Sequence, residues 1–240
     1  MIAENLELIN ARIAAACEQA GRPRDSVRLI AVSKTKPAEM VAEAYAAGQR
    51  LFGENHAQEL TAKKPVLPED IEWHFIGNLQ RNKVKYVVGA AALIHSVNSA
   101  ALAKEIDRVA GNRGLTQDVL AEINVGGEES KQGADADEAR SLVEAVAALP
   151  HLRLRGLMTV APPADDPETV RPIFRRLREM LAEYAPLTRE PELFDQLSMG
   201  MTGDFEAAIE EGATYVRIGT AIFGAREYPA PAPQPPENAP

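Results

Sequence analysis

The sequence of 240 residues is poor in cysteine, in aromatic side chains and in long apolar runs. Cys17 is the single cysteine, which excludes a disulfide framework and a zinc site built on several cysteines. No stretch reaches the roughly 18 apolar residues that a membrane-spanning helix needs. The N-terminus lacks the basic start and the unbroken apolar core of a signal peptide. We therefore expect a cytoplasmic protein without a membrane partner.

The sequence also has fewer basic than acidic residues. It contains 26 lysines and arginines and 35 aspartates and glutamates, which gives a formal charge of −9. This balance argues against nucleic acid or an anionic membrane as the main partner. A local group of cations can still hold a small anionic ligand.

The chain does contain apolar, β-rich runs that alternate with helical patterns. We expect strands at residues 26–34, 50–54, 72–77, 92–97, 118–125, 152–160, 193–200 and 215–224. We expect helices near 37–47, 55–64, 79–87, 99–110, 135–148, 167–184 and 203–211. Several strands are apolar on both faces, which is typical of a parallel sheet covered by helices.

Eight strands with crossover helices predict an α/β protein with a single (β/α)8 TIM barrel over residues 1–226. A doubly wound open sheet is the alternative, but no G-x-G-x-x-G motif follows the first strand. An extra helix at about residues 3–20 should pack outside the barrel or across its bottom. The proline-rich residues 227–240 should form a disordered tail.

Glycine-containing turns follow the last two expected strands, where barrels often bind phosphate. Backbone N–H groups of such turns and nearby hydroxyls attract an anion. The alternative is that the turns are structural, with Thr202, Asp204 or Thr220 capping the next helix. The residues in question are Ser198, Gly200, Thr202, Gly203 and Asp204 at and beyond the end of strand seven, and Arg217, Gly219 and Thr220 within the run assigned to strand eight.

Two lysines follow the first apolar run. Lys34 lies on the same side of the expected strand as Ile30 and Val32, by the alternation of strand side chains. Lys36 precedes Pro37, which suits the first position of a helix, so Lys36 should lie on the rim. Lys34 is therefore the better candidate for the barrel mouth.

A lysine at that place can form a Schiff base with a carbonyl compound. It can equally pair with a phosphate, or with Glu54 at the end of the second strand. A lysine and a phosphate site across one barrel mouth suit a phosphorylated aldehyde, of which pyridoxal 5'-phosphate (PLP) is the common biological example.

Five motifs occur in order along the chain: "LIAVSKTKP", "FGENHAQE", "WHFIGNLQRNK", "LSMGMTGDFEAAIEEG" and "VRIGTAIFG". On these motifs the sequence resembles the YggS/PROSC family of pyridoxal phosphate homeostasis proteins, from about residue 5 to 226. The resemblance implies the fold-type III PLP barrel, as in the N-terminal domain of alanine racemase. It also implies that Lys34 holds the cofactor as a Schiff base. Arg217 would face the pyridine nitrogen and, being protonated, keep the ring a weak electron sink.

The resemblance further implies the groups that hold the rest of the cofactor. Ser198 and the backbone around Gly219 and Thr220 would bind the phosphate. Asn55 and Met199 would line the ring.

The function implied is a non-catalytic PLP carrier that stores the aldehyde and releases it to PLP-dependent apoenzymes. Because no long apolar surface stretch demands a partner, we also expect a monomer. An amino-acid racemase is the alternative, but it needs a base on each face of the substrate carbon. In the alanine racemase type a tyrosine from a C-terminal domain supplies the second base, and this chain stops after strand eight. No motif marks a replacement among Tyr45, Tyr86, Tyr184, Tyr215 and Tyr228. A class I aldolase would carry its lysine later in the barrel.

Other polar features have plainer interpretations. His74 lies either near the ring or as a satisfied histidine of the core, which we favour. The histidines show no spacing for a metal site. The segment 126–133 is either a lid or solvated surface, and Arg171, Arg175 and Arg178 should form a solvated helix face.

Overall fold

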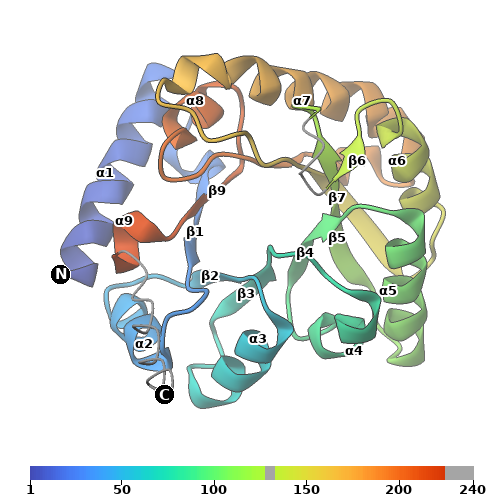
Figure 1. Ribbon diagram of the computed structural model, residues 1–240, viewed down its shortest axis with the longest axis horizontal. Coiled ribbons are helices and arrows are strands. Elements are labelled where there is room, and N and C mark those ends of the chain that lie inside the picture. Colours follow the sequence, from blue (N-terminus) through green and yellow to red (C-terminus); the bar gives the residue numbers. More distant parts are fainter. Residues whose placement is uncertain (128–132, 225–240) are drawn as a thin grey trace, which may run out of the picture.

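Eight parallel strands close into a barrel in the computed structural model, which describes residues 1–127 and 133–224 (Figure 1). β9 pairs with β1, and β4 pairs with β5, so the ring has no open edge between them. The (β/α)8 barrel expected from the sequence is thus confirmed. Its strands are β1 (Arg28–Val32), β2 (Leu51–Glu54), β3 (Glu72–Phe75), β4 (Leu93–Val97), β5 (Gln117–Asn124), β7 (Leu152–Met158), β8 (Gln196–Ser198) and β9 (Tyr215–Ile218). The two-residue strand β6 (Ala134–Asp135) pairs in parallel with the last two residues of β5 and is not part of the ring.

A helix or helical turn follows each barrel strand and covers its outer face (Figure 1). These elements are α2 (Ala38–Ala46), α3 (Ala57–Lys63), α4 (Val84–Val87), α5 (Ala100–Asn112), α6 (Ala139–Ala147), α7 (Arg171–Tyr184), α8 (Phe205–Glu210) and α9 (Thr220–Phe223). Within the described ranges, no helix is long and apolar enough to cross a membrane.

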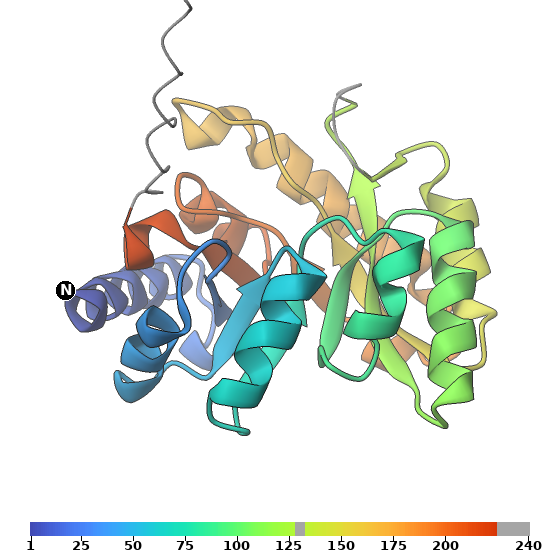
Figure 2. The same ribbon diagram turned by 60° about the horizontal axis from the view of Figure 1, so that its bottom comes forward.

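The extra N-terminal helix α1 (Ile2–Gln19) lies outside the barrel, alongside α8 and α9, in both views (Figures 1 and 2). The Asn5 side chain donates to the Ile222 carbonyl at 2.9 Å, and Arg12 pairs with Glu206 at 2.6 Å. Of the two places expected for this helix, the structure therefore has the outer one.

Three expected elements are shorter than the sequence suggested. The strand expected at 215–224 ends at Ile218, because the chain turns at Gly219 and begins α9. The strand expected at 193–200 is reduced to β8, since a 3-10 turn at Pro191–Leu193 occupies its start. The helix expected at 79–87 is a 3-10 turn, Arg81–Lys83, followed by the single turn of α4.

Apolar side chains form two separate layers because strand residues alternate between the faces of the sheet. The larger core lies between the strands and the helices and includes Phe52, Ile94 and Phe174. A smaller cluster fills part of the barrel interior, and its buried members are Ile30, Leu51, Leu93, Leu120, Met158 and Tyr215.

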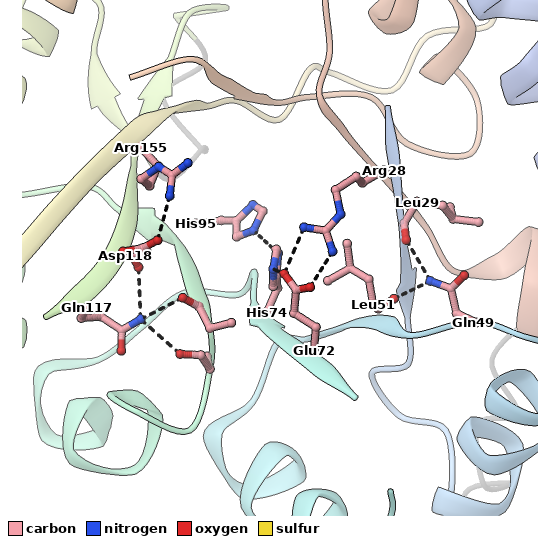
Figure 3. A network of polar contacts seen from close by, with 12 residues as sticks. Arg28, Leu29, Gln49, Leu51, Glu72, His74, His95, Gln117, Asp118 and Arg155 are labelled. Atoms are coloured by element: carbon pink, nitrogen blue, oxygen red, sulfur yellow. Dashed lines mark hydrogen bonds and ion pairs between the residues drawn. The ribbon is translucent and has the colours of Figure 1, made fainter. Parts of the chain in front are cut away.

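Charged side chains occupy the interior at the N-terminal ends of the strands (Figure 3). Arg28 donates two hydrogen bonds to Glu72, at 2.5 and 3.1 Å. Across the barrel, Asp118 accepts from Arg153 at 2.7 Å and from Arg155 at 3.1 Å. Paired ions therefore close this end, which leaves the other end for a ligand.

Candidate functional site

A cavity of about 300 Å³ lies at the C-terminal ends of the strands, where barrel proteins place their sites. Its volume is at the low end of the roughly 300–1,000 Å³ usual for small-molecule sites. It is lined by Val32, Lys34, Asn55, Ile76, Val160, Met201, Thr202, Arg217, Gly219 and Thr220.

Lys34 reaches the cavity because the chain turns sharply after β1. Thr35 has a left-handed backbone conformation, with φ of 63°, which is unfavourable for a β-branched residue. The turn is held by the Thr35 N–H, which donates to Glu59 at 2.7 Å, and by the Lys36 N–H, which donates to the Ser33 carbonyl at 3.1 Å. Lys34 lines the cavity, on the side that strand parity predicted, and Lys36, which precedes Pro37, is not among the lining residues.

Glu54 pairs with Lys63 and not with Lys34. Its buried carboxylate accepts from Lys63 at 2.6 Å and from the Ser33 hydroxyl at 2.7 Å. These contacts lie on the helix-facing side of β2, opposite to the interior position of Gly53. The salt bridge between Lys34 and Glu54, which was one interpretation of the sequence, is therefore wrong.

Arg217 places a buried guanidinium beside Lys34 at the cavity. Its Nη1 donates to the Ser198 hydroxyl at 2.5 Å, and its Nη2 donates to the Thr159 carbonyl at 2.9 Å. Burial lowers the pKa of Arg217 to about 10, opposed by Asp204 and Glu122, so the group is still protonated at neutral pH. The cavity thus contains a fixed cation suited to an acceptor atom or an anion.

Asn55 follows β2 and is one of the residues that line the cavity. Its side-chain Oδ1 is buried and has no hydrogen-bond partner within the described structure. A Cβ at Gly77 would lie 2.3 Å from the Asn55 carbonyl oxygen, so only glycine lets the chain after β3 pass this close. An oxygen without a partner at this place fits a ligand that brings a hydrogen-bond donor.

The turn after β8 presents Met201 and Thr202 to the cavity. The Asp204 carboxylate accepts from the Met201 N–H at 2.6 Å and fixes the turn, while Gly200 has a φ of 91°. Burial raises the pKa of Asp204, and the Met201 hydrogen bond opposes this. Of the three capping candidates, only Asp204 stands at an N-cap, that of α8, and its carboxylate bonds to the turn instead of capping the helix. Thr202 lines the cavity.

Five of the seven expected cofactor residues meet in this cavity: Lys34, Asn55, Arg217, Gly219 and Thr220. Ser198 and Met199 lie outside its lining, and both are fully buried. Met199 belongs to the core between strands and helices, because it follows β8 with the opposite parity to Ser198.

Sequence reasoning missed Ile76, Val160 and Met201 as lining residues. Met201 could have been found, since it lies in the same turn as Thr202. Ile76 and Val160 follow the ends of β3 and β7 and have no distinguishing side chain. Their place depends on how the loops fold over the barrel.

A hydrogen-bonded chain runs through the barrel interior behind Arg217. Ser198 Oγ lies 2.8 Å from His95 Nδ1, His95 Nε2 lies 2.9 Å from His74 Nδ1, and His74 Nε2 lies 2.9 Å from Glu72. Figure 3 shows His95, His74 and Glu72 following one another toward Arg28. Burial lowers the pKa of both histidines. His74 is therefore a satisfied core histidine, as the favoured interpretation had it.

The remaining features carry no part of the site. Over the described ranges, no group of three or more metal-ligating side chains occurs. Arg171, Arg175 and Arg178 form ion pairs with Glu211, which is a structural cluster and not a ligand patch. Residues 128–132 of the expected lid and the tail 227–240 lie outside the described residues.

The fold and the cavity together define a class of protein, the barrels related to alanine racemase. The family model "Alanine racemase, N-terminal domain" matches residues 5–227. A solved alanine racemase from Corynebacterium glutamicum superimposes with a TM-score of 0.67 at 20% identity, over 94% of this chain and 61% of that one. At this identity the likeness shows the shared fold alone.

Closer relatives narrow the class to one family. A pyridoxal phosphate homeostasis protein from Aquifex aeolicus is 48% identical over 227 residues, 94% of this chain and 98% of that one. PipY from Synechococcus elongatus, solved with PLP bound, has a TM-score of 0.78 and 38% identity, over 93% of this chain and 100% of that one. This chain belongs to the family of pyridoxal phosphate homeostasis proteins.

Proposed function

We propose that this protein binds PLP in the cavity at the C-terminal end of the barrel and holds it as a Schiff base on Lys34. Its role would be intracellular PLP homeostasis and delivery. The observation that carries the proposal is the meeting of Lys34, Arg217 and Asn55 in one cavity of about 300 Å³. A relative that is 38% identical was solved with PLP bound.

Each lining residue has a role that its chemistry supports. The cofactor's aldehyde would supply the carbon that condenses with the neutral Lys34 amine, with loss of one water. Arg217 donates to the ring nitrogen and stays a cation. Asn55 Oδ1 accepts from the ring hydroxyl and so gains the partner that it lacks. Thr202, Gly219 and Thr220 bind the phosphate with hydroxyl and backbone donors.

We infer a carrier and not a racemase, because a racemase needs a second base at the cavity. No tyrosine, histidine or carboxylate is among the lining residues of the described structure. Tyr45 and Tyr86 lie on the outside of the barrel, and Tyr184, the last residue of α7, is buried in the core between strands and helices. Tyr215 lies in the interior cluster against His74 and His95. Tyr228 lies outside the described residues.

We further propose that the protein acts as a monomer in the cytoplasm and passes PLP to PLP-dependent apoenzymes. Large exposed apolar side chains are few in the described chain and come from separate elements. This distribution supports a protein that needs no permanent partner.

The cofactor spectrum tests the proposal. Purified protein supplied with PLP should develop visible absorbance, and borohydride reduction followed by peptide mapping should place the label on Lys34. Lys36→Ala is the matched control and should keep the absorbance. A wild type that stays colourless with added PLP would exclude the binding role, and a label on Lys36 would refute the assignment of the lysine.

A second assay separates carrier from racemase. Loaded protein is incubated with single L-amino acids, and the D-isomer is measured over time. We expect no steady production of D-isomer. Sustained turnover would show that the protein is an enzyme and would reverse this part of the proposal.

A further inference from the structure

The interior chain of hydrogen bonds has one consistent direction, and it can be derived from its acidic end. The bond from His74, together with Arg28, holds the pKa of Glu72 at about 2, so Glu72 is a carboxylate that only accepts. His74 Nε2 must therefore carry a hydrogen. In a neutral imidazole the other nitrogen then accepts, so His74 Nδ1 receives a hydrogen from His95 Nε2.

The same reasoning continues to Arg217. His95 Nδ1, as the acceptor of a neutral ring, receives the hydroxyl hydrogen of Ser198. Ser198 Oγ in turn accepts from Arg217 Nη1. Every contact is satisfied by one set of protonation states, with both histidines neutral and protonated on Nε2. Arg217, Ser198, His95 and His74 each donate to the next member, and Glu72 accepts last.

We propose that Ser198, His95 and His74 are positioning residues for Arg217. Their hydrogen bonds form a relay that runs in one direction, holds the Arg217 guanidinium in place through Ser198 Oγ, and commits the Ser198 hydroxyl hydrogen to His95. Ser198 then has no hydrogen to give to a phosphate. The relay acts on the ring side of the site through Arg217, whereas phosphate binding is left to the turns at Thr202 and Thr220. This inference rests on the proposed PLP-binding function.

The main alternative is that the hydrogen bonds from His74 through His95 to Ser198 run in the opposite direction. A doubly protonated His74 would donate from Nδ1 to His95, which would donate from Nδ1 to Ser198 and release the serine hydrogen. The groups facing His74 are Glu72, Arg28, Asp118, Tyr215 and His95. Two of the charged ones are negative and one is positive. His95 faces Tyr215, Ser198 and the positive Arg217, in addition to His74.

Burial decides between the two directions. His74 has 1% of its surface exposed and His95 has none, so a second proton would place a cation in the barrel core. Desolvation is the largest influence on both rings and opposes that proton. The neutral relay is therefore the resting state of the protein without ligand.

NMR of the histidine ring nitrogens in the ligand-free protein tests the direction of these hydrogen bonds without any cofactor. The chain has four histidines, and labelling their ring nitrogens distinguishes the two tautomers and the cation. We expect His74 and His95 to be neutral and protonated on Nε2 at pH 7, with assignments from His74→Gln and His95→Gln and with the exposed His151 as reference. A cationic His74, or a hydrogen on Nδ1 of His95, would overturn the relay.

Binding of PLP and of pyridoxal, which lacks the phosphate, tests the role of Ser198. If Ser198 acts through Arg217, Ser198→Ala should raise the Kd of both ligands by a similar factor, on the order of ten-fold for one lost hydrogen bond to a charged group. It should also shift the visible absorbance maximum. Thr220→Val is the matched control on the phosphate side of the cavity. It should raise the Kd of PLP and leave the Kd of pyridoxal unchanged.

The opposite pattern would refute the proposal. Loss of PLP affinity in Ser198→Ala with unchanged pyridoxal affinity and an unchanged spectrum would make Ser198 a phosphate ligand. If neither ligand binds the wild type, the proposed function fails. The NMR result on the ligand-free protein would still decide the direction of the relay.

Discussion

The inside of the barrel and the layer outside it are built from the same strands but from different chemistry. Outside, strand and helix side chains form one continuous apolar core. Inside, a small apolar cluster lies between ion pairs at one end and, at the other, a cavity lined by both polar and apolar side chains. Alternation along each strand lets one residue serve packing and its neighbour serve the ligand.

This division separates stability from function. The apolar layer removes the most surface from water and should supply most of the hydrophobic stabilisation. The interior buries an arginine and two histidines, which is unfavourable unless every polar atom finds a partner. Substitutions on the outer face of the strands should therefore affect mainly stability, and substitutions at the cavity should affect mainly ligand binding.

The largest expected effect comes from the inner face, at Lys34. Lys34→Ala removes the only lysine among the lining residues of the described structure, so the visible absorbance with PLP should disappear entirely. The free energy of unfolding of the ligand-free protein should change by less than about 1 kcal/mol, because Lys34 is half-buried and near solvent. Urea unfolding and the absorbance spectrum check both parts. A large loss of stability would contradict the division.

The matched substitution on the outer face is Phe174→Ala in α7. Phe174 is buried between α7 and the strands, and the cavity left behind should cost about 3–5 kcal/mol of unfolding free energy. Phe174→Leu should lose less unfolding free energy than Phe174→Ala, since leucine keeps most of the side-chain volume. At temperatures where the variant is folded, its PLP spectrum should match that of the wild type. An altered spectrum would show that the two layers are coupled.

A smaller, pH-dependent effect is expected at Glu122, which faces the interior near Arg217. Burial raises the pKa of Glu122 to about 7 from an ordinary value of 4.5, although Arg217 opposes the shift. Between these values the unfolded chain releases the proton and the folded chain keeps it, so stability falls as the pH rises. Glu122→Gln should therefore be more stable than the wild type at pH 8, by at most about 3 kcal/mol.

The gain in Glu122→Gln should shrink toward pH 5, as measured by urea unfolding at several pH values. His74 and His95 act in the opposite direction, because their lowered pKa values cost stability as the pH falls below 6.5. The difference between variant and wild type isolates the carboxyl. A gain that does not depend on pH would show that Glu122 is not the titrating group.

The smallest effect is expected at Arg178, whose side chain is about half exposed and pairs with the buried carboxylate of Glu211. Arg178 pairs with Glu211 at 3.2 Å, and Arg171 and Arg175 pair with the same carboxylate. Arg178→Ala should change the free energy of unfolding by less than about 1 kcal/mol, because the other arginines remain. A larger change in thermal unfolding would mean that the three arginines act cooperatively.

The sequence predicted the barrel and the cavity better than it predicted the interior. Alternating apolar runs identify strands, and the parity of Lys34 with Ile30 and Val32 placed its side chain correctly. The contact between His74 and His95 depends on the register of β3 against β4, in which His74 lies opposite Leu93. That register follows from the closure of the ring and has no local signal.

The hydrogen-bond partners of Ser198 could not be predicted from the sequence either. A serine after a strand and before a glycine turn is typical of a phosphate site. Its actual neighbours, Arg217 and His95, come from β9 and β4, and only the packing of the interior brings them together. The strand endings at Ile218 and Ser198 were misjudged for a related reason, since apolar residues continue into the following turns.

Gly77 carries a consequence for how this sequence can drift during evolution. Its Cβ would meet the backbone of Asn55 and not a movable side chain, so even alanine would displace the segment that presents Asn55 to the cavity. Selection for the ligand should therefore act on Gly77 as strictly as on Lys34, although Gly77 does not line the cavity. Among natural variants of this protein, a change at Gly77 should be as damaging as one at a ligand-contacting residue.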